Sequence, residues 1–299
     1  MKIPAFLKKG DTVAIVAPAK AIEKKYIDNA KNFWEEKGFK VKIGTNCSGK
    51  SNYFSGTDAE RTQDLQTAIN DESVKAIICA RGGYGCVRIV DRINWASFLN
   101  DPKWIVGFSD ITVFHQRLAK LNIGSLHASM PLNYMENTSE SLLSMVDVLK
   151  GSQTNYQWKS STKNKNGTVT GQLIGGNMAV LNGLIGTNEM PDYCDKILFL
   201  EEVGEHLYKL DRMFFQLQKS GVLDQIRGLV LGGFTSTKDT DVPFGKPFEE
   251  IVKEHFQYKN IPLAFDFPAG HQIDNRALVF GETVQFKVDD NECSLISLT

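Results

Sequence analysis

The 299-residue sequence predicts an α/β protein, with a doubly wound parallel sheet domain followed by a smaller, β-rich α+β domain. Apolar, β-branched runs alternate with amphipathic stretches through the first 121 residues, as strands and helices do in such sheets. Residues 151–167 then shift to Ser, Thr, Asn, Lys and Gln, a composition typical of a linker. We therefore expect domains at residues 1–150 and 168–299, joined by a linker at 151–167.

The elements of the first half follow in regular order. Strands are expected at residues 12–18, 41–43, 74–80 and 104–108, where the runs are apolar or β-branched. Helices are expected at residues 22–37 and 55–71, in a stretch that ends near residue 93, and at 109–121. This alternation predicts helices on both faces of the sheet.

The second half is less regular. Strands are expected at residues 168–174, 197–201, 229–234, 277–280, 283–288 and 294–297. Helices are expected at residues 177–185, 208–220 and 248–256. We interpret this half as a separate α+β domain.

Charge and composition exclude several classes of protein. The 34 basic residues balance 35 acidic ones, so the sequence carries no electrostatic signature of a nucleic-acid or anionic-membrane binder. No apolar run approaches the roughly 18 residues that a membrane span needs, and the first ten residues lack the apolar core of a signal peptide. The five cysteines are scattered without CxxC spacing, which favours a reducing compartment. We expect a cytoplasmic protein.

Cofactor and metal signatures are missing as well. The first strand is followed by Ala-Pro-Ala-Lys and not by a GxGxxG turn, which disfavours a dinucleotide. The histidines show no HExxH or other paired ligand spacing. We expect neither a cofactor nor a metal.

A serine follows the fourth predicted strand. The segment WIVGFSDIT runs from an apolar strand directly into Ser109 and Asp110 and then into an amphipathic helix. A serine there lies at the carboxyl end of a strand, where open α/β sheets bind ligands, and at a helix N-terminus, which favours an oxyanion. The GxSxG pattern is absent, because Ile111 occupies the final glycine position. A helix cap made by Ser109 or Asp110 is the alternative.

Three further segments could contribute to a site. The turn ARGGYG follows a strand, and its glycines could bring backbone N–H groups to an anion or form a plain tight turn. Glu201 and Glu202 end an apolar strand, so at least one of them faces a pocket, a partner or solvent. The segment FPAGH delivers His271 on a loop, as a general base or as an exposed side chain. None of these segments is decisive alone.

Together the motifs resemble one family. GDTVAIVAPA, ARGGYG, GFSDIT, LIGGN, LFLEEVGE and FPAGH occur in the order seen in the LD-carboxypeptidases, from residue 10 to residue 271. These Ser-Glu-His peptidases remove the terminal D-alanine from peptidoglycan tetrapeptides. The resemblance implies a flavodoxin-like N-terminal domain, a β-rich C-terminal domain and a site in the groove between them. It also implies hydrolysis of the L,D-peptide bond in cell-wall recycling.

The resemblance assigns roles to individual residues. Ser109 would be the nucleophile, Glu201 rather than Glu202 the acid, and His271 the base. The backbone N–H groups of Gly83 and Asp110 would form the oxyanion hole. Arg81, Tyr84 and Arg212 are the candidates for binding the peptide substrate, and a homodimer is implied by the resemblance alone. This chain departs from the family where many members have His-Gly-Pro-Met, since it has His127-Ala-Ser-Met-Pro.

Two other functions compete with this interpretation. Microcin-C immunity peptidases share the motifs and cleave a peptidyl or aminoacyl nucleotide, but no insertion that could stack on a base is apparent here. A non-catalytic cell-wall peptide-binding protein on the same fold would have no need of all three of Ser109, Glu201 and His271.

Overall fold

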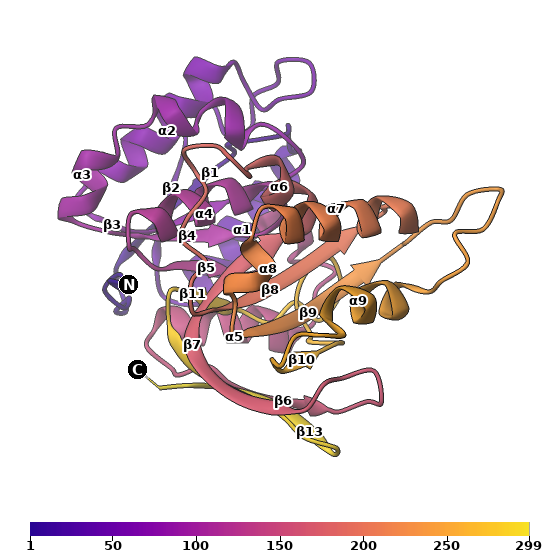
Figure 1. The fold of residues 1–299 in the computed structure, drawn as a ribbon. Helices are drawn as coiled ribbons and strands as arrows, with labels where there is room; N and C mark the ends of the chain where they lie inside the picture. The colour runs from indigo at the N-terminus through magenta and orange to yellow at the C-terminus, as the bar shows by residue number, and fades with distance from the viewer. Residues whose placement is uncertain (299) are drawn as a thin grey trace.

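The computed structural model describes residues 1–298, which fold around two sheets (Figure 1). The first sheet has six strands in the order β11-β5-β4-β3-β1-β2. Its strands are β1 (Thr12–Val16), β2 (Lys40–Ile43), β3 (Val74–Cys79), β4 (Trp104–Gly107), β5 (Ser125–His127) and β11 (Leu278–Phe280). β1 to β5 run parallel, and β11 adds antiparallel at the edge. This arrangement confirms the predicted parallel α/β sheet.

Helices cover both faces of the first sheet. They are α1 (Lys24–Glu36), α2 (Asp58–Asn70), α3 (Trp95–Asn100), α4 (Thr112–Lys120) and α5 (Ser139–Leu149). Ile15 points to the face where Trp34 of α1 and Met145 of α5 pack, whereas its neighbour Ala14 points to the face covered by α2 and α4. Each large apolar side chain buried in this way stabilises the fold by roughly 1.5–3 kcal/mol. The period-two burial explains why these strands are apolar throughout.

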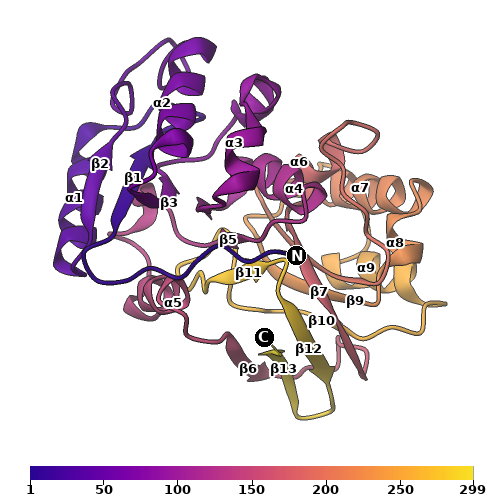
Figure 2. The same cartoon turned by 90° about the vertical axis from the view of Figure 1, so that its left-hand side faces the viewer.

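The second sheet has seven strands in the order β10-β9-β8-β7-β12-β13-β6. They are β6 (Asn155–Lys159), β7 (Gly167–Asn177), β8 (Lys196–Val203), β9 (Gly228–Thr235), β10 (Leu263–Ala264), β12 (Thr283–Val288) and β13 (Glu292–Ser297). The helices of this half are α6 (Met178–Gly183), α7 (Leu207–Lys219), α8 (Val222–Gln225) and α9 (Phe248–Phe256). α1 and α2 lie on the opposite side of the molecule from α7, α8 and α9 (Figure 2).

The structure differs from the sequence-based expectation at three places. The segment expected as a helix ending near residue 93 forms two 3-10 turns, Cys86–Arg88 and Val90–Arg92. The Gly85 carbonyl accepts the Arg88 N–H at 3.1 Å, as in a 3-10 turn, and also accepts from Arg61 Nη1 at 3.0 Å. The segment expected as a linker contains β6, which pairs with β13. The strand expected at 277–280 in the second domain is β11 of the first sheet.

β11 joins the first sheet beside β5, where side chains of the two halves pack together. Leu278 pairs opposite His127 of β5, so the strand satisfies its backbone groups there. Phe280 and Phe199 of β8 both pack against the His127 ring, at centroid distances of 5.6 and 5.0 Å. The sheets therefore meet along β5, β11 and β8.

No helix among the described residues is long and apolar enough to cross a bilayer.

Candidate active site

Ser109 lies on a sharp turn between β4 and α4. It begins the 3-10 turn Ser109–Ile111, and its φ of +62° lies in the left-handed region that residues other than glycine rarely adopt. Such strained strand-to-helix turns present the nucleophilic serine of α/β-hydrolases. The caps of this turn and of α4 are Phe108 and Ile111, neither with a side-chain cap bond. The structure thereby excludes the capping alternative for Ser109 and Asp110.

Asp110 holds the glycine turn next to the serine. Its carboxylate is buried, and Oδ2 accepts the backbone N–H of Cys86 at 2.8 Å. Burial raises the pKa of the Asp110 carboxyl, while the N–H groups of Cys86 and Gly85 oppose that rise. Gly83 and Gly85 in this turn have φ values of +104° and +149°, which only glycine adopts without strain. Asp110 thus connects the turn that follows β3 to the turn that follows β4.

Gly82 makes the closest approach of this turn to Ser109. A Cβ at position 82 would lie 2.9 Å from Ser109 Cβ, 3.0 Å from its Oγ and 3.2 Å from the Asp110 nitrogen. A Cβ at position 83 would instead meet Lys20 and Tyr53, both at 3.0 Å. The space in front of the serine therefore depends on a glycine at position 82.

We expect Gly82→Ala to lower kcat/KM by about 100-fold, because the methyl group would displace Ser109 or the turn by part of an ångström. Steady-state kinetics and a melting curve would measure the effect. Gly183→Ala is the matched control, since a Cβ there meets nothing within 4 Å. Equal activity of the two variants would contradict the expected role of Gly82.

Glu201, on the second sheet, is hydrogen-bonded to His271, in the loop between β10 and β11. Glu201 lies on β8, where the pairing with β9 shifts register between Leu200 and Glu202. A bulge of this kind redirects side chains. The Glu201 side chain is fully buried, and its Oε2 accepts from His271 Nδ1 at 2.6 Å and from the His271 backbone N–H at 3.2 Å. The structure thus brings these two predicted site residues together.

The Glu201 carboxylate sets the protonation of His271. Burial opposes the imidazolium, but the charge and the hydrogen bond of Glu201 outweigh it, so the pKa of His271 lies above its ordinary value. Because Nδ1 is engaged with Glu201, Nε2 is the ring nitrogen left to exchange a proton with a serine.

A pH prediction follows from the raised pKa of His271. A general base must be neutral, and the neutral fraction of His271 falls as pH drops through its pKa. We therefore expect the acid limb of the kcat/KM profile to lie above about pH 6.5, the unperturbed histidine value. A pH–rate profile would check this, and a limb well below that value would contradict it.

Ser109 and His271 line one cavity of about 410 Å³, between the two sheets. The glycine turn contributes Arg81, Gly82 and Gly83 to its wall. Arg81 is the only permanent cation among the described lining residues, and its Nη1 donates to the Ala21 carbonyl at 3.0 Å.

The other predicted substrate-binding residues lie elsewhere. Tyr84 is half exposed beside Phe54, and Arg212 on α7 lies over the ring of Tyr208; neither is among the described residues that line this cavity. As substrate-binding residues, both stay predictions.

Asn177 and Glu202 also line this cavity. Glu202 was weighed against Glu201 as the triad acid, and Asn177 carried no prediction. Glu202 accepts from Asn177 Nδ2 at 3.0 Å and from the backbone of Ala179 at 2.7 Å. Burial raises the pKa of the Glu202 carboxyl. The Asn177 N–H donates to Thr112 Oγ1 at 2.9 Å, so α4 and β7 are in direct contact. The sequence signal that could have placed Asn177 at the site is its position at the end of LIGGN, between a predicted strand and a predicted helix.

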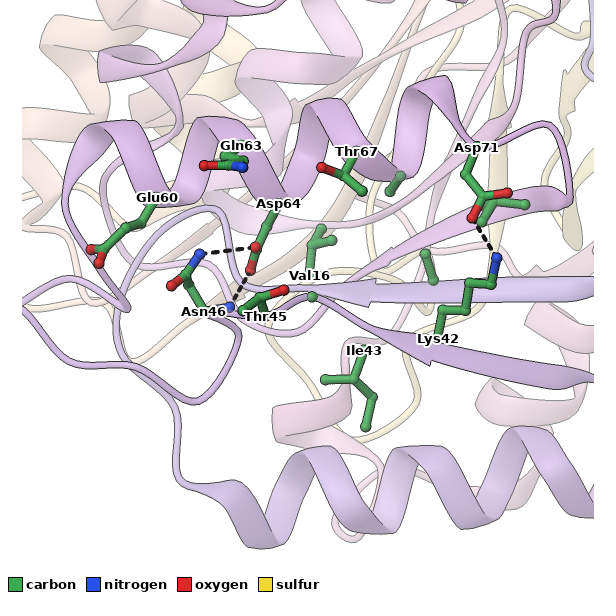
Figure 3. Close-up of a pocket in the computed structure, with 14 residues that line it drawn as sticks. Val16, Lys42, Ile43, Thr45, Asn46, Glu60, Gln63, Asp64, Thr67 and Asp71 are labelled. Atoms are coloured by element: carbon green, nitrogen blue, oxygen red, sulfur yellow. Dashed lines mark hydrogen bonds and ion pairs between the residues drawn. The ribbon is translucent and has the colours of Figure 1, made fainter.

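A larger cavity, of about 500 Å³, lies between β2 and α2 (Figure 3). At one end Asp64 accepts from the Asn46 backbone and side chain, at 2.8 and 3.0 Å, and at the other Lys42 pairs with Asp71 at 2.5 Å. These carboxylates hold the loop after β2 and the end of α2, and none of the predicted site residues lines this cavity. The cavity beside Ser109 is therefore the candidate active site.

Among residues 1–298, no group of three or more His, Cys, Asp or Glu side chains is arranged to hold a metal.

Two family models match the sequence. Residues 13–128 match the LD-carboxypeptidase N-terminal domain and residues 170–286 the LD-carboxypeptidase C-terminal domain. A probable murein peptide carboxypeptidase of Bacillus subtilis is 31% identical over 93% of this chain and 89% of its own length. The murein tetrapeptide carboxypeptidase of Pseudomonas aeruginosa is 30% identical over 91% of both chains.

Solved structures are similar over nearly the whole chain. The muramoyltetrapeptide carboxypeptidase of Oxalobacter formigenes superposes with a TM-score of 0.89, at 28% identity, over 96% of this chain and 98% of its own. The microcin C7 self-immunity protein superposes with a TM-score of 0.86 at 21% identity, over 98% of both chains, a level that indicates a shared fold alone.

Proposed function

Because this chain belongs to the LD-carboxypeptidase family, we propose that it hydrolyses the L,D-peptide bond that joins the terminal D-alanine to murein tetrapeptides. The observation that supports the proposal is the cavity lined both by Ser109, on its left-handed turn, and by His271, whose Nδ1 is hydrogen-bonded to Glu201. The reaction is a carboxypeptidase hydrolysis that needs no cofactor, since the three side chains supply nucleophile, base and orienting acid.

The proposed mechanism begins with proton transfer from Ser109 Oγ to His271 Nε2. The hydroxyl oxygen then attacks the carbonyl carbon of the third stem residue. Glu201 holds the Nδ1–H and stabilises the imidazolium as it forms. The backbone N–H groups of Gly83 and Asp110 are the proposed donors to the tetrahedral oxyanion.

The tetrahedral intermediate then collapses to an acyl-enzyme, an ester on Ser109 that is hydrolysed in a second step. His271 returns the proton to the departing nitrogen, the C–N bond breaks, and D-alanine leaves. A water molecule, deprotonated by His271, attacks the ester carbonyl; the C–Oγ bond breaks, His271 returns the proton to Ser109 Oγ, and the tripeptide leaves.

Arg81 is the proposed partner of the terminal carboxylate of D-alanine. It is the permanent cation on the cavity wall, and an Arg–carboxylate pair is among the stronger charge-assisted contacts.

We place the reaction in the cytoplasm, where peptidoglycan fragments are recycled. All five cysteines are free thiols, as a reducing compartment requires. A homodimer stays a prediction.

Mass spectrometry of purified protein incubated with murein tetrapeptide tests the function. Loss of one alanine residue is expected, and the diastereomer that ends in L-alanine should stay intact, because the site is proposed to read the configuration of the leaving residue. No cleavage of the natural tetrapeptide by folded protein would overturn the proposal. Cleavage of an aminoacyl nucleotide instead would favour an immunity peptidase, and failure with both substrates would favour a peptide-binding protein.

A further inference from the structure

The loop that carries His271 is held by the N-terminus of α5, a helix of the first half of the chain. The N–H of Thr138, the N-cap of α5, donates to the Ile273 carbonyl at 3.1 Å. Asn137 Nδ2 donates to the same carbonyl at 2.9 Å. The buried Ser141 Oγ accepts the backbone N–H of Asn275 at 2.7 Å. The first sheet's half of the molecule thus fixes a loop that belongs to the other half.

Asn275 connects this anchor to the base. It is completely buried, and its Oδ1 accepts the backbone N–H of Gly270 at 2.8 Å. Asn275 therefore closes residues 270–275 into a small hydrogen-bonded loop, with His271 inside it. Without that acceptor, the Gly270 N–H would be a buried donor lacking its partner.

Gly270 in turn lies directly against the Glu201 side chain. Its φ is +107°, and a Cβ there would lie 2.7 Å from Glu201 Cβ and 2.9 Å from Glu201 Oε2. The next residue, His271, uses both its backbone N–H and its Nδ1 to reach that same Oε2. A small rotation of the peptide at position 270 would therefore change both contacts together.

We propose that Asn275 is a positioning residue that holds Gly270 so that His271 meets Glu201 through both its ring and its backbone. It acts through Gly270 and touches neither the cavity nor the substrate in this arrangement. The inference rests on the proposed role of His271 as the base. Asn275 would connect the loop of His271 to α5, and α5 belongs to the half of the chain that carries Ser109.

Kinetics of Asn275→Ala test the proposal. We expect kcat to fall by about 10- to 100-fold with KM changed by less than about threefold, because a displaced base lowers the chemical step and leaves the binding wall intact. Asn275→Asp keeps an oxygen acceptor for the Gly270 N–H and should recover most of the lost kcat.

An NMR titration of the His271 ring gives a readout that a merely structural role would not move. The titratable groups around His271 are Glu201, Glu202 and the buried His127, and Glu201 dominates the favourable interactions. Weakening the contact with Glu201 should lower the pKa of His271 in Asn275→Ala. The titration needs no substrate, so it separates failure of this inference from failure of the proposed function.

Ser144→Ala is the matched control. Ser144 is also a serine of α5, and its Oγ accepts the N–H of Ala277, beyond the loop that carries the base. Its kcat and the pKa of its His271 should match the wild type. A folded Asn275→Ala variant whose kcat and His271 pKa match those of the wild type would overturn the inference, even if its melting temperature were lower. If Asn275→Ala does not fold, Ser141→Ala decides, because it removes the acceptor of the Asn275 N–H and should shift kcat and pKa in the same direction.

Discussion

Ser109→Ala is expected to abolish turnover of the murein tetrapeptide, with a loss in kcat of about 10⁴- to 10⁶-fold. The methyl group cannot attack the scissile carbonyl, so neither the pair of Glu201 and His271 nor the oxyanion donors can compensate. Substrate binding should persist, because the cavity wall loses only the Ser109 hydroxyl. Single-turnover mass spectrometry should show no acyl-enzyme in the variant, and calorimetry would measure its affinity for the tetrapeptide.

Ser129→Ala is the control for that experiment. Ser129 is a completely buried serine whose Oγ has no hydrogen-bond partner among the described residues, and it lies two residues after β5. Removing this hydroxyl breaks no bond, so activity should stay near that of the wild type. Comparable turnover by Ser109→Ala and the wild type would require a different nucleophile.

Glu201→Gln is expected to lower kcat by about 10⁴-fold, the effect seen when the acid of such a triad becomes an amide. The amide can donate to His271 Nδ1, which leaves the proton on Nε2, where it blocks acceptance of the serine proton. The negative charge that raises the pKa of His271 is also lost. The acid limb of any residual activity should therefore move to lower pH, which a pH–rate profile would measure.

Glu202→Gln distinguishes the role of Glu202 from that of Glu201, the other carboxylate of the LEE segment. Glu202 accepts from Asn177, Ala179 and Val203 and has no bond to His271, so its loss should lower the melting temperature more than it lowers kcat. A larger loss of kcat in Glu202→Gln than in Glu201→Gln would reverse the assignment of the acid.

Much of the fold could be predicted because its signals are local. The runs at β1, β3 and β4 are apolar on both faces, and the alternation with α1, α2 and α4 follows from helical periodicity. The second sheet was harder, since β6 and β10 are short and their pairing partners lie far away in the sequence. α5 carried no prediction, although its buried face packs on the first sheet.

The candidate site divides in the same way. The motifs around Ser109, Glu201 and His271 indicated the residue types and their order in the chain. They did not indicate the left-handed φ of Ser109, the register shift at Glu201 or the hydrogen bond from Gly270 to Asn275. The φ of Ser109 and the register shift at Glu201 are backbone geometry that neighbours in space impose. Asn275 is held by Ser141, which lies 134 residues away in the sequence.

By itself, then, the sequence determined the parallel α/β class, the alternation of its first half, and the family to which the six ordered motifs belong. Tertiary structure alone decided that β11 pairs with β5 at the edge of the first sheet, and that α5 holds the loop that carries His271. The physical reason is that periodicity and turn chemistry act over a few residues, whereas burial of Phe280 and Phe199 against His127 and of Glu201 against Gly270 requires the whole chain to be folded.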